Sequence, residues 1–168
     1  NPECTVHDIG DGVMCIEFQT KGNSIGEGIA KGINEAIDIA ERDGWNGIVI
    51  GNNDKQFSVG ANLMNMGMMA MQKNFDEIEK FLVGFQKILM RMMTCNIPVV
   101  SATHGFVMGG GLEVSIHCDA GIHASESYIG LVEAGVGLIP GGGGTKEMAM
   151  RASDSFNSGD VKMPSLID

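Results

Sequence analysis

The sequence predicts an α/β layered fold with mostly parallel strands. Short apolar runs bounded by glycine, such as residues 48–50 between Gly47 and Gly51, are typical of buried strands. Longer segments between these runs repeat apolar residues at the spacing of a helix. With 168 residues, of which 43% are hydrophobic, the chain can form one core and not two. Strands that alternate with helices in this way indicate a sheet with helical crossovers.

The first half of the chain supplies two strands and one helix. Residues 13–18 form an apolar run and are expected to be the first strand. Residues 26–42 are expected to form an amphipathic helix, because isoleucines and alanines recur there at helical spacing. Gly44 ends this helix, and residues 47–51 then form a buried strand.

The second half continues the alternation. A long helix is expected over residues 75–95, where an apolar stripe follows one face, and Pro98 then precedes a strand. Three further strands are expected at residues 99–103, 121–124 and 128–131. Short helices are expected at residues 110–117 and from Gly143 or Gly144 through Met150.

Charge and composition exclude some classes of function. A formal net charge of −10 argues against nucleic acid, whose phosphates bind basic surfaces. No apolar run approaches the roughly 20 residues that cross a bilayer, so no membrane span is expected. The start of the chain has no methionine and no pattern of a secretion signal, which suggests a trimmed piece of a protein.

The four cysteines are scattered along the chain and form no C-x-x-C pair. Neither they nor the histidines have the spacing of metal ligands, so we expect no metal site. Reduced thiols and a cytoplasmic location are the simplest interpretation.

Two glutamates lie twenty positions apart, each beside a run of glycines. Glu113 closes the run 108–113, and Glu133 precedes the glycine-rich segment 135–144. Bare glycine backbone lets a substrate approach free N–H groups, and a carboxylate beside such a site can move protons. Alone, Glu113 could be a helix-start acid and Glu133 a solvated loop acid. Together they suggest a catalytic acid and base.

Other motifs in the chain are weaker. Residues 22–26 match the G-x-S-x-G pattern of serine hydrolases, but residues 19–21 separate it from the preceding strand where an immediate sharp turn is needed. Ser24 is better explained as a residue near a helix start. The glycines at 26–32 and 141–146 match neither a dinucleotide fingerprint nor a Walker A loop. Eight of the thirteen methionines fall between Met64 and Met93, which suits core filling or a pocket for a variable acyl chain.

Four separated segments give the chain a family resemblance. Residues 57–63, 98–102, 105–113 and 128–145 occur in the order and spacing of the crotonase (enoyl-CoA hydratase/isomerase) superfamily, which the chain resembles over about residues 12–151. Residues 130–140, with the glycines that follow, look most like the hydratase domain of bacterial two-domain 3-hydroxyacyl-CoA dehydrogenases. The resemblance implies a repeated β-β-α spiral core over residues 1–151, C-terminally truncated. Residues 152–168 would be a polar tail, either a loop or the start of an incomplete region.

The resemblance also implies a role for individual residues. Glu113 and Glu133 would hold a water molecule and act as base and proton donor, and Gly141 would help to position that water. The N–H groups of Ala61 and Gly110 would form an oxyanion hole. The coenzyme A site would include Lys21, Gly22, Ser24, Val59, Gly60, Asn62 and Leu63. The substrate would be a coenzyme A thioester, with no metal or other cofactor.

The expected activity is hydration of 2-enoyl-CoA thioesters to 3-hydroxyacyl-CoA in fatty-acid β-oxidation. Double-bond isomerisation, a non-catalytic acyl-CoA-binding fragment and a serine hydrolase are the alternatives. The family usually has aspartate where this chain has Asn62, and its members run to about 250 residues. Missing C-terminal helices would expose apolar surface, which favours a homo-oligomer of the trimer type. A fused dehydrogenase domain would belong to the parent protein.

Overall fold

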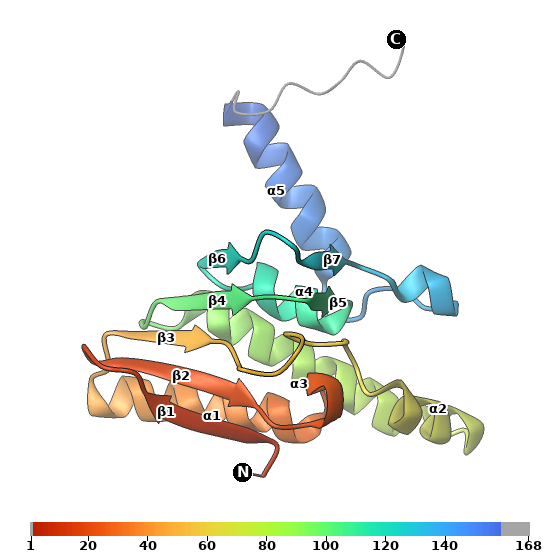
Figure 1. Cartoon of the computed structure of the whole chain (residues 1–168). Coiled ribbons are helices and arrows are strands. Elements are labelled where there is room, and N and C mark those ends of the chain that lie inside the picture. Colours follow the sequence, from red (N-terminus) through yellow and green to blue (C-terminus); the bar gives the residue numbers. More distant parts are fainter. Residues whose placement is uncertain (1, 159–168) are drawn as a thin grey trace.

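The main sheet is built in chain order (Figure 1). A computed structural model describes residues 2–158. Five strands lie side by side in the order β1-β2-β3-β4-β6. Their bounds are β1 Cys4–Asp8, β2 Val13–Phe18, β3 Gly47–Ile50, β4 Val99–Thr103 and β6 Ala120–His123. A separate pair joins β5 Phe106–Met108 to β7 Tyr128–Gly130.

Most of the strand pairs are parallel, as the sequence predicts. Strands β2, β3, β4 and β6 pair in parallel, and so do β5 and β7. The exception is the antiparallel hairpin of β1 and β2, in which Cys4 lies opposite Phe18. The strand β1 was not predicted, because only Cys4 of its five residues is buried and the segment lacks a strong apolar run.

Two long helices cover one face of the main sheet (Figure 1). Helix α1 spans Glu27–Asp43 and helix α3 spans Phe75–Thr94, so both predicted helices are confirmed to within one residue. Alternate residues of β2 are buried against these helices, so the core lies between the sheet and the helical layer. The fully buried side chains include Met14, Ile16, Ile29, Ile33, Ile37, Ile48, Ile50, Phe57, Leu89 and Met92. Arg91 of α3 joins the two helices through an ion pair with Asp38, with 2.6 Å between Nη2 and Oδ1.

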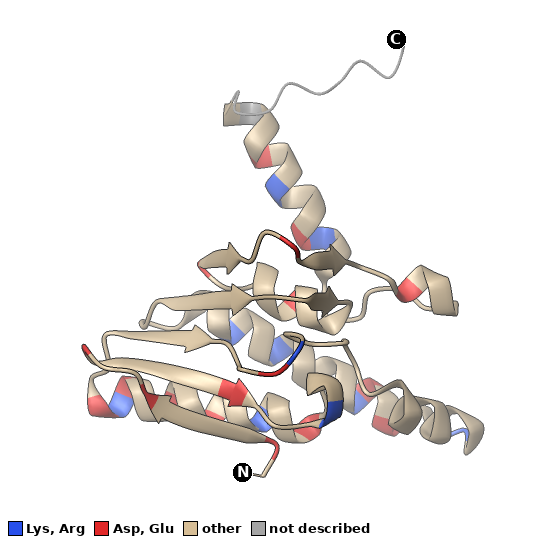
Figure 2. Ribbon diagram, in the orientation of Figure 1, with Lys and Arg blue, Asp and Glu red and all other residues tan. Residues whose placement is uncertain are grey.

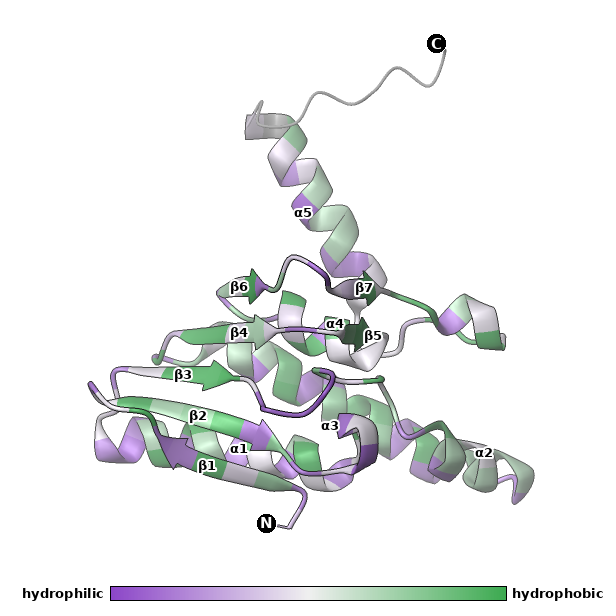
Figure 3. Ribbon diagram, in the orientation of Figure 1, coloured by the Kyte–Doolittle hydropathy of each residue, from purple (hydrophilic) through white to green (hydrophobic). Residues whose placement is uncertain are grey.

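Helix α2, Leu63–Met71, was not predicted and contributes no buried residue to the core. Its sequence is rich in methionine, and Figure 3 shows it as largely hydrophobic. Asn62 starts the helix, because its side-chain oxygen accepts a hydrogen bond from the N–H of Asn65 at 3.2 Å. The periodic apolar pattern that reveals a helix packed on a core is therefore absent here.

The remaining helices lie around the second glycine run. Helix α4 spans Gly110–Ile116 and helix α5 spans Gly144–Ser158, and the short 3-10 turns η1 and η2 span Lys21–Asn23 and Glu133–Val136. Helix α5 extends away from the main sheet (Figure 1) and contacts α4 near its start. Residues 152–158 continue this helix, so of the two alternatives for the tail the loop does not hold over this stretch. The interpretation of residues 159–168 lies outside the described residues.

The acidic residues are scattered over several elements and do not gather on one (Figure 2). Across residues 2–158 no helix combines the length and the apolar character that a membrane crossing requires. All four cysteines are free thiols, and burial raises the pKa of Cys118 to about 12.

We predict that Leu89→Ala destabilises the chain by about 2–5 kcal/mol, because it removes a fully buried side chain between α3 and the sheet. Urea unfolding followed by circular dichroism measures this change. The control is Met90→Ala on the same helix, whose side chain is 45% exposed and should change the free energy of unfolding by less than about 0.5 kcal/mol. Equal losses in both variants would contradict the packing described for α3.

Candidate active site

The carboxyl group of Glu113 is held inside the protein by backbone N–H groups. Glu113 lies in the first turn of α4 and is 2% exposed. Its Oε1 accepts hydrogen bonds from the N–H of Gly142 at 2.8 Å and of Gly144 at 2.9 Å. Burial raises the pKa of Glu113 above its ordinary value, and the nearby charge of Glu133 raises it too, while the N–H donors act in the opposite direction.

Glycines of the run at residues 141–144 pack closely against Glu113, and this packing requires residues without a side chain. A Cβ on Gly142 would lie 2.6 Å from Oε2 of Glu113 and 2.7 Å from the ring of Phe85, so no larger residue fits without displacing the carboxyl group. The predicted water-positioning residue, Gly141, lies next to it. Its carbonyl oxygen accepts a hydrogen bond from Nε2 of Gln86 on α3 at 2.7 Å. The run is therefore fixed between α3 and α4.

Strand pairing brings Glu133 to the same place. Met108 pairs with Gly130 at the ends of β5 and β7, and the N–H of Gly109 donates to the Gly130 carbonyl at 2.8 Å. Glu133 follows three residues later, and its Oε1 lies 2.9 Å from where a Cβ of Gly109 would be. Its Oε2 is buried and has no hydrogen-bond partner among the described residues. The two glutamates predicted as a pair thus lie within electrostatic reach of each other.

The backbone N–H groups of Ala61 and Gly110 are also neighbours. Gly60 has a φ of 92°, and a Cβ there would lie 2.8 Å from the Met108 carbonyl oxygen, so only glycine fits this approach. The N–H of Ile25 donates to the carbonyl oxygen of Gly60. The carbonyl oxygen of Ile25 accepts a hydrogen bond from the N–H of Asn62. A Cβ on Gly110 would be 3.5 Å from the Ala61 nitrogen. Gly110 opens α4, where N–H groups have no partner within the helix.

The segments predicted to bind coenzyme A lie side by side. The N–H of Val59 donates to the carbonyl of Gly22 at 3.1 Å. Between them, the hydroxyl of Ser58 donates to the carbonyl of Asn23 at 2.7 Å. Asn23 and Ser58 are both buried, and sequence reasoning missed them as the link between these segments. The remaining predicted residues, Lys21, Ser24, Gly60, Asn62 and Leu63, belong to these same two segments.

The structure bears on the interpretation of Ser24 and Asn62. Ser24 follows the turn η1 and lies two residues before Gly26, the N-cap residue of α1, so it stands near the helix start as the sequence suggests. The same turn separates Ser24 from β2, which does not match the strand–turn–helix arrangement of a serine hydrolase. Asn62 caps α2 with its amide oxygen, a role that needs no charge.

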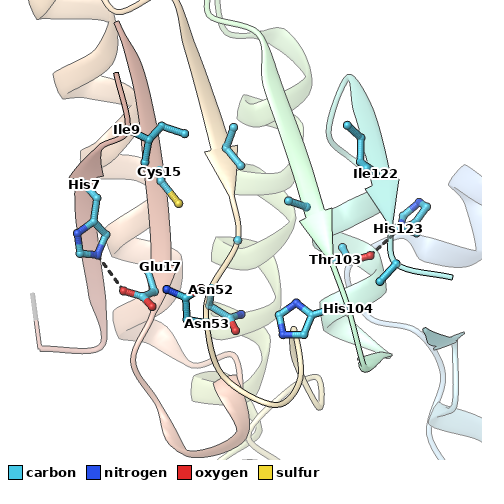
Figure 4. Close-up of a pocket in the computed structure, with 14 residues that line it drawn as sticks. His7, Ile9, Cys15, Glu17, Asn52, Asn53, Thr103, His104, Ile122 and His123 are labelled. Carbon is cyan, nitrogen blue, oxygen red and sulfur yellow. Dashed lines mark hydrogen bonds and ion pairs between the residues drawn. The ribbon is translucent and has the colours of Figure 1, made fainter. Parts of the chain in front are cut away.

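A cavity lies elsewhere, at the carboxyl ends of β2, β3 and β4 on the sheet face turned away from the helices (Figure 4). Its volume is about 750 Å³, and its lining includes His7, Glu17, Asn52, His104 and His123. None of the predicted site residues lines it. A smaller hollow of about 360 Å³ lies beside the predicted site and is lined by Ile25, Asn62, Met66, Met68, Met69 and Phe81, among others. Within residues 2–158 no group of three or more His, Cys, Asp or Glu side chains has an arrangement suited to a metal.

Sequence reasoning also missed two buried polar residues behind Glu113. His117 is 1% exposed and Glu147 is 3% exposed, although both belong to residue types that usually face water. The signal in the sequence is weak, because neither residue stands in a recognisable motif.

The arrangement defines a class of protein. A buried carboxylate, a second carboxylate beside it and two adjacent backbone N–H donors suit proton transfer next to a developing negative charge on oxygen. The family model described as "Enoyl-CoA hydratase/isomerase" matches residues 8–158. The chain therefore belongs to the enoyl-CoA hydratase/isomerase family, and the resemblance seen in the sequence is confirmed.

Among curated proteins, the chain is similar to a "Probable 3-hydroxyacyl-CoA dehydrogenase" of Bacillus subtilis (strain 168). The two are 43% identical over 162 residues, which cover 94% of this chain and 20% of the relative. The "Short-chain-enoyl-CoA hydratase" of Clostridium acetobutylicum is 35% identical over 102 residues, which cover 61% of this chain and 38% of that protein.

Solved structures share the fold. An enoyl-CoA hydratase from Polaromonas sp. JS666 superposes with a TM-score of 0.83 at 23% identity, over 88% of this chain and 58% of that one. A structure from Geobacillus kaustophilus HTA426 gives a TM-score of 0.79 at 26% identity, over 89% and 56%. The crotonase-like fold is thus confirmed, and the chain spans less than two thirds of the length of these proteins.

We predict that Glu113→Gln raises the free energy of unfolding at neutral pH. Burial raises the folded-state pKa of Glu113 above its ordinary value, so its ionised form is disfavoured in the folded chain. The favourable contribution of the protonated acid is present below the unfolded pKa and is lost as the pH rises through the folded pKa. The stability difference between variant and parent should therefore be largest at neutral pH and shrink in acid.

Urea unfolding at several pH values, from about 4 to about 8, measures this difference. Glu126→Gln removes an exposed carboxylate and is the control. A stability difference for Glu113→Gln that grows as the pH falls would contradict the raised pKa.

Proposed function

We propose that the chain is a hydratase domain that adds water to 2-enoyl-CoA thioesters. The observation that carries this proposal is the meeting of Glu113, Glu133 and the Ala61 and Gly110 N–H groups around one glycine-lined site. The family includes hydratases and isomerases, and relatives named for hydration support the first of these activities.

The two N–H groups would stabilise charge on the thioester oxygen. When water adds to carbon 3 of the enoyl group, electron density moves to the thioester oxygen and forms an enolate. Donors already held in place stabilise such an oxyanion, and the loss of one donor typically costs about 3 kcal/mol. Because Gly110 has no side chain, the carbonyl can reach both its N–H and that of Ala61.

The two carboxyl groups would share the proton transfers. Glu113, ionised and fixed by Gly142 and Gly144, accepts a proton from the attacking water. Glu133 donates a proton to carbon 2, so one proton enters and one leaves the enzyme for each water added. Two close carboxyl groups resist double ionisation, which favours one shared proton at the start of the cycle.

Coenzyme A would lie along the paired segments at residues 21–24 and 58–63, which the Val59–Gly22 hydrogen bond holds together. The methionine-lined hollow beside Asn62 would accept the acyl chain, because methionine side chains adapt to chains of different length.

The names of two relatives support a proposal about the parent protein. The Bacillus subtilis relative is named a dehydrogenase, and a Psychrobacter relative, 29% identical, is named "Fatty acid oxidation complex subunit alpha". We propose that the parent protein joins this hydratase to a dehydrogenase that oxidises its 3-hydroxyacyl-CoA product in the cytoplasm. Apolar residues are exposed on η2 and α5, including Val136 and Met148. They suit contacts with other parts of the parent protein or with a second copy of the chain.

We predict that Glu113→Gln and Glu133→Gln each lower crotonyl-CoA hydration by about 10²- to 10⁴-fold, because each removes one proton-transfer group. The assay follows loss of the enoyl absorbance. Glu126→Gln, an exposed change of the same kind, should keep full activity.

Other outcomes identify the alternatives. Binding of acyl-CoA without turnover by the parent chain would indicate a binding fragment. Movement of the double bond without uptake of water would indicate an isomerase. Full hydration by both glutamine variants would overturn the paired-glutamate mechanism.

A further inference from the structure

Gln86 of α3 holds one end of a peptide group whose other end holds Glu113. Its Nε2 lies 2.7 Å from the carbonyl oxygen of Gly141 in the glycine loop (residues 141–144), 55 positions away in the sequence. A carbonyl oxygen can only accept a hydrogen bond, so the NH₂ group of Gln86 is the donor. The carbonyl carbon of Gly141 is bonded to the nitrogen of Gly142, whose N–H donates to Oε1 of Glu113 at 2.8 Å. A single peptide group therefore connects the two side chains.

The planarity of this peptide group couples its two hydrogen bonds. The bond between Gly141 and Gly142 is trans, and in a planar trans peptide the C=O and N–H groups point in opposite directions. Fixing the direction of the carbonyl therefore fixes the direction of the N–H. A donor on the oxygen also polarises the group, which makes its N–H a better donor. The amide of Gln86 thus aims and strengthens the hydrogen bond that Glu113 receives.

The same face of α3 supports the glycine loop by packing. Side chains three and four positions apart lie on one face of a helix, and Leu82, Phe85 and Gln86 have this spacing. A Cβ at Gly141 would lie 2.8 Å from Leu82, and a Cβ at Gly142 would lie 2.7 Å from Phe85. The two apolar side chains limit how closely the loop approaches, and the amide of Gln86 sets the direction of its peptide group.

The helix beneath Gln86 is a rigid support. Gln86 itself is exposed, and an exposed amide on a helix can simply face water. However, Leu89, three positions further along, is fully buried and fixes α3 on the core. Because the helix is anchored in this way, the amide of Gln86 is a donor held in place and does not merely follow the loop.

We propose that Gln86 is a positioning residue that turns the N–H of Gly142 toward the carboxylate of Glu113. It touches no reacting atom and acts only through the peptide group that it holds. The second hydrogen bond to the same carboxylate oxygen, from the N–H of Gly144 at 2.9 Å, does not involve this peptide group. Loss of Gln86 should therefore affect one of the two donors and leave the other in place.

The ionisation of Glu113 is a measure of these donors. Burial is the largest cause of its raised pKa, and the charge of Glu133 acts in the same direction. The N–H groups of Gly144 and Gly142 lower the pKa, because they stabilise the ionised form. Weakening the hydrogen bond from Gly142 should therefore raise the pKa of Glu113.

The test variant is Gln86→Met, which removes the amide donor and keeps a side chain of the same length and similar helix propensity. The matched control is Gln19→Met. It also removes an exposed amide, one that donates to Oε2 of Glu17 at 2.9 Å and not to the loop. If Gln86→Met does not fold, Gln86→Ala removes the same donor and decides in its place.

The measurement is an NMR titration of the full chain, labelled on glycine nitrogens and on glutamate carboxyl carbons. In the parent, the N–H signals of Gly142 and Gly144 should both shift as Glu113 ionises, because a carboxylate accepts a stronger hydrogen bond than a neutral acid. In Gln86→Met the shift of Gly142 should shrink, that of Gly144 should remain, and the pKa of Glu113 should rise. Gln19→Met should match the parent.

Two results overturn the proposal. The first is a titration of Gly142 and Glu113 that is unchanged in Gln86→Met. The second is an equal loss of response at Gly142 and Gly144, because that pattern indicates a general loosening of the loop and not the turning of one peptide group.

Turnover supplies a second test, which rests on the proposed hydratase function. In Gln86→Met the kcat for crotonyl-CoA should fall about 2- to 10-fold, the effect of one hydrogen bond, with little change in KM. The acid limb of kcat/KM should move to higher pH. A parent chain without hydration would reject the proposed function and leave the NMR test intact. Hydration by the parent with an unchanged kcat and acid limb in Gln86→Met would reject positioning alone.

Discussion

The structure around the site depends on one constraint, the capture of a single carboxylate oxygen by two backbone N–H groups. Oε1 of Glu113 joins α4 to the loop that begins α5 through Gly142 and Gly144. A buried carboxylate is costly unless hydrogen bonds satisfy it. Its partners here are main-chain groups, which cannot rotate away without moving the loop. The conformation of that loop and the ionisation of Glu113 are therefore coupled.

The same constraint explains the crowded glycines. The loop must approach the carboxylate, the ring of Phe85 and Leu82 so closely that a Cβ at Gly141 or Gly142 would overlap them. On the other side of the site, Gly60 approaches the Met108 carbonyl and brings Ala61 beside Gly110. These glycines are therefore needed for the close approach of backbone segments more than for backbone flexibility. Each allows a backbone amide to stand where a side chain would otherwise keep it away.

Much of this could be predicted from the sequence, because packed elements leave periodic patterns. The helices α1 and α3 and the strands β2 to β4 show such patterns, and the glutamates stand out beside their glycines. The exposed β1 and α2 escaped prediction, since their residues pack on little that would impose a period. The pair of His117 and Glu147 escaped because their burial comes from α4 and α5 meeting in space. No spacing along the chain encodes that contact.

The order of the strands bears on how the chain acquires its structure. Because β1, β2, β3, β4 and β6 lie in the sheet as they occur in the sequence, each new strand adds to an edge formed by the one before. These parallel pairings span long stretches of chain, as from Ile48 to Val99, but each uses only strands already made, which suits stepwise folding from the N-terminus during synthesis. Glu113, Glu133 and the glycine loop all belong to the later steps. The hydrophobic framework can therefore form first, and the chemical groups are added to a surface that is already in place.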